Sequence, residues 1–138
     1  MIRTIGLLAG AILAIGACSE AQETGFSDKC AIFVDDPDAK SNIRDMNANA
    51  MSFCACMSQL TAAKSSGDQA FIRATLTDLT TRMQETGQGV EAVAAPMMNE
   101  AMAQPDSADA QATISGIEKL GRLIDEIEGA FDDGTCTN

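Results

Sequence analysis

The architecture of this chain can be worked out from one segment, Ile43-Arg44-Asp45-Met46-Asn47-Ala48-Asn49-Ala50-Met51-Ser52-Phe53-Cys54-Ala55-Cys56-Met57-Ser58-Gln59-Leu60. Its apolar residues recur at every third or fourth position, at 43, 46, 50, 53, 57 and 60. This is the spacing of the buried face of an amphipathic α-helix. We therefore predict one helix that runs through this segment to about residue 64, followed by a turn at Ser65-Ser66-Gly67.

Two cysteines in the predicted helix point in different directions. Cys54 and Cys56 are two positions apart, so their side chains project about 160° away from each other around the helix. Their sulfurs cannot bond to each other without unwinding that helix. We expect two disulfides that join the helix to Cys30 on its N-terminal side and to Cys136 near the C-terminus. The sequence leaves open which cysteine pairs with which.

Two further helices are predicted after the turn. Ser66 and Gln69 have the spacing of a capping box, and the helix that they open ends at Gly87. The next helix spans residues 89–103, and Pro96 should kink it or start a fresh turn. The clearest apolar stripe belongs to the first of these two helices and consists of Ile72, Leu76, Leu79 and Met83.

A long last helix is predicted from a cap at Asp106 or Ser107. Gly116 and Gly121 lie inside it, where they permit close packing or lower its stability. Its apolar stripe consists of Ile114, Ile117, Leu120, Ile124, Ile127 and Phe131.

The predicted fold class is all-α. A short helix that begins near Phe26 and carries Cys30 precedes the cysteine-bearing helix, and Asp35-Asp36-Pro37-Asp38 breaks it. No segment alternates apolar and polar residues in the way a strand requires. We predict a small bundle of four main helices plus the short N-terminal one, with up-and-down connections and two disulfides, in a single domain over residues 26–138.

The N-terminal residues are typical of an export signal. Arg3 precedes an apolar run over residues 4–15, which is too short for a membrane-spanning helix of about 20 residues. The run ends in Ile15-Gly16-Ala17-Cys18, an aliphatic residue, two small residues and a cysteine. This pattern resembles the lipobox of bacterial lipoproteins, and the resemblance covers about the first 20 residues of the chain.

The resemblance implies lipidation at Cys18. Signal residues 1–17 would be removed, and Cys18 would carry a diacylglyceryl thioether and an N-acyl chain, which is enough lipid for stable anchoring. Ser19, in place of Asp, implies transfer to the outer membrane, with the protein facing the periplasm. Residues 18–25 would form a lipid-attached tether. The alternative is cleavage after Ser19-Glu20-Ala21, which would release a soluble periplasmic or secreted protein.

The charge of the chain limits its partners. It has 20 Asp and Glu against 9 Lys and Arg, and loss of Arg3 with the signal leaves 8 basic residues and a net charge of −12. This charge disfavours nucleic acid and anionic lipid headgroups. An acidic surface is compatible with a basic or other envelope protein partner, but a charge of this sign more often serves only solubility.

We do not expect an enzyme or a bound cofactor. The chain contains no His, so the usual general base and the Ser-His and Cys-His nucleophile pairs are missing. Carboxylates near the C-terminus are typical of a solvated helix end: Asp125, Glu126, Glu128, Asp132 and Asp133.

The sequence therefore favours a membrane-anchored interaction, assembly or inhibitor protein. The alternative function is that of a periplasmic soft-metal or redox carrier. In that case Cys54, Cys56 and Met57 would supply thiolate and thioether ligands for copper(I). Such a carrier needs free thiols, which export to an oxidising compartment disfavours.

Overall fold

Six helices form the part of the chain that the structure describes, which is residues 17–138, with side chains from Gly25 onward. This is a computed structural model, and over this range it contains no strand. The predicted all-α class is confirmed. The helices are α1 (Ala17–Val34), α2 (Pro37–Asp45), α3 (Ala50–Ala62), α4 (Ser66–Thr86), α5 (Val90–Ala103) and α6 (Ala108–Asp132). None of the described helices is long and apolar enough to cross a bilayer.

Helix α1 is longer than the short N-terminal helix that we predicted. It begins at Ala17 instead of near Phe26, so residues 18–25 are its first turns. The Ala, Glu and Gln residues in this stretch have good helix propensity, which is the physical reason for the extension. Residues 1–16, which make up nearly all of the predicted signal 1–17, lie outside the described residues, and the side chain of Cys18 is not among those described. The predicted break at residues 35–38 is confirmed, because α1 ends at Val34 and α2 starts at Pro37.

The single helix predicted over residues 43–64 is wrong, because the chain breaks between α2 and α3. Met46 caps the end of α2, and Asn47 then adopts a left-handed conformation with φ 54°, which Asn tolerates better than most residues. The Asn49 side chain accepts hydrogen bonds from the Met51 and Ser52 N–H groups, and the Ser52 hydroxyl accepts one from the Asn49 N–H. This capping box starts a new helix where the apolar spacing alone predicts continuity.

Helix α4 has the predicted apolar face but a different cap. Its four stripe residues are all buried. Ser65, not Ser66, is the N-cap, and its hydroxyl accepts a hydrogen bond of 3.2 Å from the Asp68 N–H. Gln69 instead donates its side-chain amide to the carbonyl oxygens of Ala62 and Lys64. Gly87 ends the helix with φ 68°, as a C-terminal glycine in the left-handed region does.

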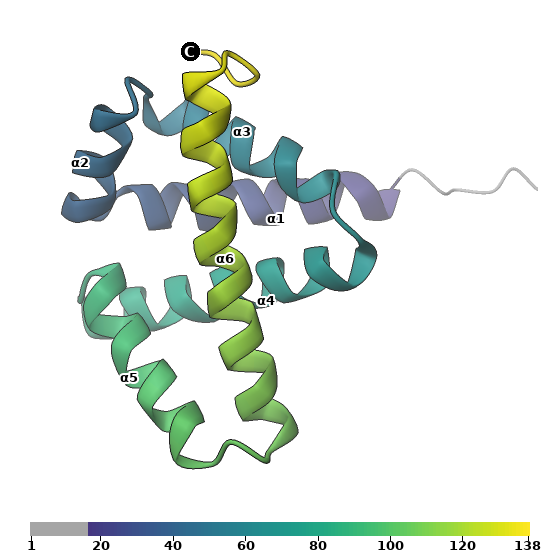
Figure 1. The fold of residues 1–138 in the computed structure, drawn as a ribbon, viewed down its shortest axis with the longest axis vertical. Helices are drawn as coiled ribbons and strands as arrows, with labels where there is room; N and C mark the ends of the chain where they lie inside the picture. The colour runs from purple at the N-terminus through teal and green to yellow at the C-terminus, as the bar shows by residue number, and fades with distance from the viewer. Residues whose placement is uncertain (1–16) are drawn as a thin grey trace, which may run out of the picture.

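Helix α5 and the first half of α6 form a hairpin that extends away from α1, α2 and α3 (Figure 1). Pro96 lies on the exposed side of α5, which continues through it as one helix. The buried face of α6 is rotated from the predicted stripe: Leu120 and Ile127 are buried, whereas Ile114, Ile117, Ile124 and Phe131 are only half-buried. Its remaining buried residues are Ala110, Gly116, Leu123 and Ala130.

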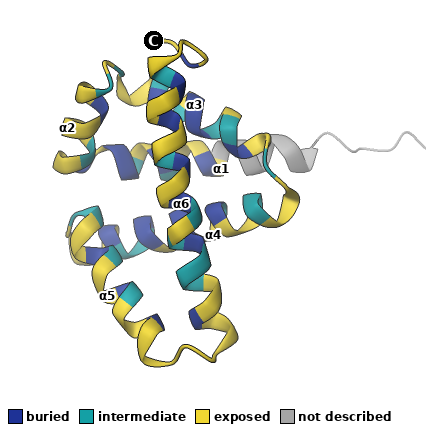
Figure 2. Cartoon of the chain, viewed as in Figure 1, coloured by how far each residue is buried: buried dark blue, intermediate teal, exposed yellow. Residues whose placement is uncertain are grey.

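A close approach between α4 and α6 explains that rotation. A Cβ atom on Gly116 would lie 1.9 Å from Thr75 Oγ1 and 3.2 Å from Thr75 Cβ, so only glycine fits there. The Gly116 side of α6 therefore faces α4. The two helices cross at a steep angle instead of running alongside each other, so the up-and-down arrangement that we predicted is wrong (Figure 1). Buried residues concentrate where α1, α3, α4 and the upper half of α6 meet (Figure 2).

Two disulfides connect α3 to distant parts of the chain. Cys30 on α1 bonds Cys54, and Cys136 bonds Cys56, each with Cα atoms 5.8 Å apart. Cys54 and Cys56 thus have different partners, as their helical spacing requires. Beyond Cys136, the Asn138 side-chain oxygen accepts hydrogen bonds from the Asn49 N–H, the Asn49 side-chain amide and the Ser52 hydroxyl. The C-terminal segment is therefore held against the start of α3.

Candidate functional site: an apolar groove between α1 and α3

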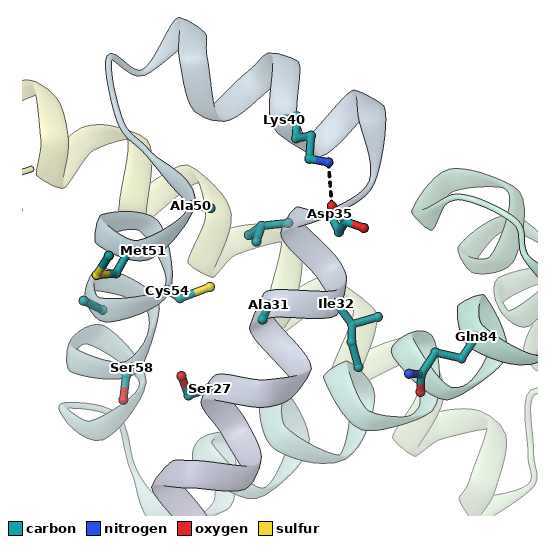
Figure 3. A pocket seen from close by; sticks show the side chains of 12 residues that line it. Ser27, Ala31, Ile32, Asp35, Lys40, Ala50, Met51, Cys54, Ser58 and Gln84 are labelled. Carbon is teal, nitrogen blue, oxygen red and sulfur yellow. Dashed lines mark hydrogen bonds and ion pairs between the residues drawn. The ribbon is translucent and has the colours of Figure 1, made fainter.

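A groove of about 950 Å³ lies along α1 and α3 and reaches α4 (Figure 3). Most of its lining side chains are small or apolar. They are Ser27, Ala31, Ile32, Val34 and Asp35 of α1 and its end, Lys40 of α2, Ala50, Met51, Cys54, Ala55 and Ser58 of α3, and Gln84 of α4.

The helical periodicity of α3 decides which side chains face the groove. Phe53, Cys56 and Met57 point into the core. Residues 51, 55 and 58 are spaced by four and three positions, so they share one side of the helix. Figure 3 shows Met51, Cys54 and Ser58 on α3 across from Ser27 and Ala31 on α1. The groove is thus the outer side of the same two helices whose inner sides form the core.

A covalent bond joins the two walls of the groove. Cys54 lines it and bonds Cys30, which is fully buried on α1. The disulfide limits how far α1 and α3 can separate, so the groove keeps its width without a ligand. A preformed groove loses less conformational entropy on binding than one that must be ordered first.

The groove has a shallow floor and a flexible edge. Ser27, Ala31, Ala55 and Ser58 are small, so the backbone of a bound segment can approach the helices closely. The Met51 side chain stands on the edge and is 82% exposed. Methionine is flexible and polarizable, and it is common on surfaces that adapt to a binding partner.

One ion pair lies at the corner where α1 meets α2. The Lys40 Nζ donates a hydrogen bond to the Asp35 carboxylate (Figure 3). This bond, together with the positive charge of Lys40, holds the pKa of Asp35 below its ordinary value. Both side chains are exposed, so the pair contributes little to stability. It gives this corner of the groove a polar boundary.

The groove offers binding surface instead of reactive groups. Its two hydroxyls, on Ser27 and Ser58, have no His to act as a base, because the chain contains none. The single cysteine in the groove lining, Cys54, is already bonded to Cys30. The side chains that it presents can therefore contact a ligand but do not form a nucleophile and base pair.

The proposed copper ligands do not converge. Cys54 and Cys56 are bonded to Cys30 and Cys136, so neither is a thiolate in this form, and Met57 is completely buried. Across residues 25–138, no three His, Cys, Asp or Glu side chains lie close enough together to hold a metal ion. A carrier role would require reduction of both disulfides and movement of Met57.

The carboxylates that the sequence places near the C-terminus lie outside the groove. The five acidic residues near the end of α6 are exposed, and Glu126 among them pairs with Lys64 at 2.7 Å. Asp36 is buried at the start of α2, where its side chain accepts hydrogen bonds from the Asp38 and Ala39 N–H groups. None of these groups lines the groove.

Among the residues that line the groove, only Cys54 is a candidate site residue from the sequence, as a disulfide partner or copper ligand, and the groove itself is not predicted. A usable signal was present, because Met51 and Ala55 are apolar residues outside the buried stripe of α3 and repeat at four positions. Ser27 and Ala31 repeat in the same way on α1. The sequence does not show that these two faces are neighbours, because their pairing depends on the tertiary packing of α1 against α3.

Comparison of the chain with protein-family models, with curated proteins and with solved structures finds no match.

Proposed function

We propose that this protein is a lipid-anchored, non-enzymatic interaction protein of the bacterial cell envelope. It would be held in the outer membrane by acyl chains on Cys18 and would bind another envelope protein in the groove between α1 and α3. The observation that carries the proposal is an exposed apolar groove whose two walls are joined by a disulfide.

The two disulfides support export. Disulfides persist in oxidising compartments and are rare in the cytosol. The lipobox-like sequence that ends at Cys18 supports anchoring, as opposed to release. Cys18 lies in the first turn of α1. Acyl chains on Cys18 would therefore be attached at the start of the helix that forms one wall of the groove. The groove would then face the periplasm, close to the membrane surface.

The expected occupant is an apolar segment of a basic envelope protein. Its apolar residues would contact Ala31, Ala55 and Met51, and its basic side chains would match the net charge of −12 that remains after removal of Arg3. Such a partner could be a component that this protein assembles or an enzyme that it inhibits.

Intact mass spectrometry of the protein purified from its native envelope tests the anchor. With and without reduction and alkylation, it reports acylation and thiol state together. A chain that begins at Cys18 with three acyl chains and no free thiols is the expected result. A chain that begins at Gln22 would refute the anchor, and free Cys54 and Cys56 with bound metal would favour the carrier alternative.

Site-specific photocrosslinking in the native envelope tests the groove. A photoreactive residue in place of Ala55 should crosslink to one protein through an apolar segment flanked by Lys or Arg. The matched control replaces Ala112, an alanine on α6 that is also exposed. Met51→Glu should weaken the Ala55 crosslink about tenfold, the effect of about 1.4 kcal/mol. Equal crosslinking from both positions, or insensitivity to Met51→Glu, would refute the groove as the binding site.

A further inference from the structure

A second, smaller pocket lies between the start of α2, the start of α5 and the side of α6. It has a volume of about 220 Å³. Its apolar lining includes the buried side chains of Phe33, Ile43 and Phe53, and the half-buried side chains of Met46 and Ile124. With Val90 and Glu91 of α5, residues from α1, α2, α3, α5 and α6 meet at this pocket.

Acidic residues surround the apolar lining. Asp38 of α2 and Glu91 of α5 are exposed, and both line the pocket. Asp36 lines it as well and is buried. Within residues 25–138, no Lys or Arg lines the pocket, and Asp36, Asp38 and Glu91 form no ion pair. The pocket lining thus holds three carboxylates and no cationic side chain, and the charge of Asp36 is partly offset by the three backbone N–H groups that donate to it.

Asp36 retains hydrogen-bonding capacity. Its Oδ1 accepts from the Asp38 and Ala39 N–H groups at 3.0 and 3.1 Å, and its Oδ2 accepts from the Val90 N–H at 3.3 Å. A carboxylate offers about four acceptor sites, so one site on Oδ2 is left. The three backbone bonds also fix the carboxylate in place, which preorganises it for a cation.

The size of the pocket limits what can occupy it. Its volume is several times the volume that one water molecule occupies in the liquid, which is about 30 Å³. It is smaller than the pockets of about 300 to 1,000 Å³ that are typical for drug-sized ligands. It suits a single long side chain. An aliphatic stem would contact Met46 and Ile124, while a charged end would reach the carboxylates, which is how Lys and Arg bury their stems and keep their charge solvated.

We infer that this pocket binds one Lys or Arg side chain of a protein partner, with the stem on the apolar lining and the cation among Asp36, Asp38 and Glu91. The inference rests on the proposed function for the existence of a basic partner. The chemistry of the pocket is independent of that partner and can be tested with a small probe.

The probe is n-butylammonium, which reproduces the lysine side chain. It would be titrated into the full-length protein isolated from its envelope, with the methionine methyl groups labelled with ¹³C and observed by NMR. The Met46 methyl signal should shift to saturation. Met51 in the groove and Met102, which is exposed on α5, serve as internal controls and should not shift in parallel. 1-Butanol, of similar size but uncharged, should bind several-fold more weakly.

Substitution of the acidic rim provides the second test. The double variant Asp38→Asn, Glu91→Gln should bind n-butylammonium about fivefold more weakly at low salt, because two exposed charges are lost. Asp109→Asn, on an exposed part of α6, removes a charge far from the pocket and should have no effect. Unchanged signals from Met57 and Met97, both buried, would show that the variants are folded.

The outcomes separate this inference from the proposed function. Equal binding of 1-butanol and n-butylammonium, or no effect of the double variant, would overturn the cation site even if crosslinking succeeds in the groove. Saturable, charge-dependent binding at Met46 would support the site even if the groove captures no partner.

Discussion

Asp36 and Val90 are 54 positions apart in the sequence, yet the Asp36 Oδ2 accepts a hydrogen bond of 3.3 Å from the Val90 backbone N–H. The other oxygen of the same carboxylate caps the start of α2. One side chain therefore fixes the first turns of α2 and α5 relative to each other. Gly89 makes this possible, because a Cβ atom there would lie 2.4 Å from Asp36 Oδ2.

We predict that Asp36→Ala lowers the free energy of unfolding by about 2 kcal/mol, since it removes an N-cap and leaves the Val90 N–H without its partner. Gly89→Ala should be destabilising too, because its methyl group displaces the carboxylate. Urea unfolding followed by circular dichroism would measure both effects. Asp106→Ala is the control, since Asp106 is exposed and precedes the cap of α6. Equal stability of the Asp36 and Asp106 variants would contradict the role of Asp36.

Two glycines in α6 should respond to alanine in opposite ways. Gly116→Ala should destabilise by about 1 to 3 kcal/mol, because the added methyl group collides with Thr75. Gly121→Ala has nothing within 4 Å of its new Cβ and should stabilise by about 1 kcal/mol through helix propensity. Thermal unfolding of the two variants gives the comparison directly. A stabilising Gly116→Ala would show that α4 and α6 are farther apart than described.

The two disulfides should contribute unequally to stability. The Cys30–Cys54 bond spans 24 positions and the Cys56–Cys136 bond spans 80. In the chain-entropy model, their loss costs about 3.5 and about 4.5 kcal/mol, respectively. Paired Cys→Ser variants avoid a leftover thiol, and guanidinium unfolding would rank them. A larger loss for the Cys30–Cys54 pair would mean that native-state packing, not loop length, decides the order.

Acid should destabilise the protein partly through Asp68. A hydrogen bond from Lys119, at 2.6 Å, is the main cause that lowers the pKa of Asp68 below its ordinary value of 3.8. The folded protein therefore binds fewer protons at this site than the unfolded chain, so the stabilisation is present above pH 3.8 and is lost as the pH falls below it. Urea midpoints at pH 7 and pH 3 should differ less for Asp68→Asn than for the wild type. Asp106→Asn, which carries no described ion pair, should behave like the wild type.

Helix α4 shows what could be predicted from the sequence about the fold. Its apolar stripe is complete and its terminal glycine is unambiguous, so local periodicity was sufficient. The break between α2 and α3 was not predicted, because the apolar spacing continues across it while Asn47 and Asn49 supply a competing turn and cap. The orientation of α6 was not predicted either, since it depends on a contact between Gly116 and Thr75 that no local pattern records.

The candidate site was less predictable than the fold. Helical spacing showed that Cys54 and Cys56 need different partners, but not which partner each has. The groove lies between the outer faces of α1 and α3, which become neighbours only in the folded chain, where the Cys30–Cys54 bond joins the two helices. Small residues such as Ala31 and Ala55 carry little signal alone, because alanine is common on helix surfaces for its propensity.

The position of the Cys30–Cys54 bond also determines how the molecule would carry mechanical tension. A pull on the N-terminal end of α1 enters the fold ahead of Cys30 and passes through the disulfide into α3. A partner seated in the groove rests on these same two helices. Tension between a membrane attachment at Cys18 and such a partner would therefore run through two covalently joined helices.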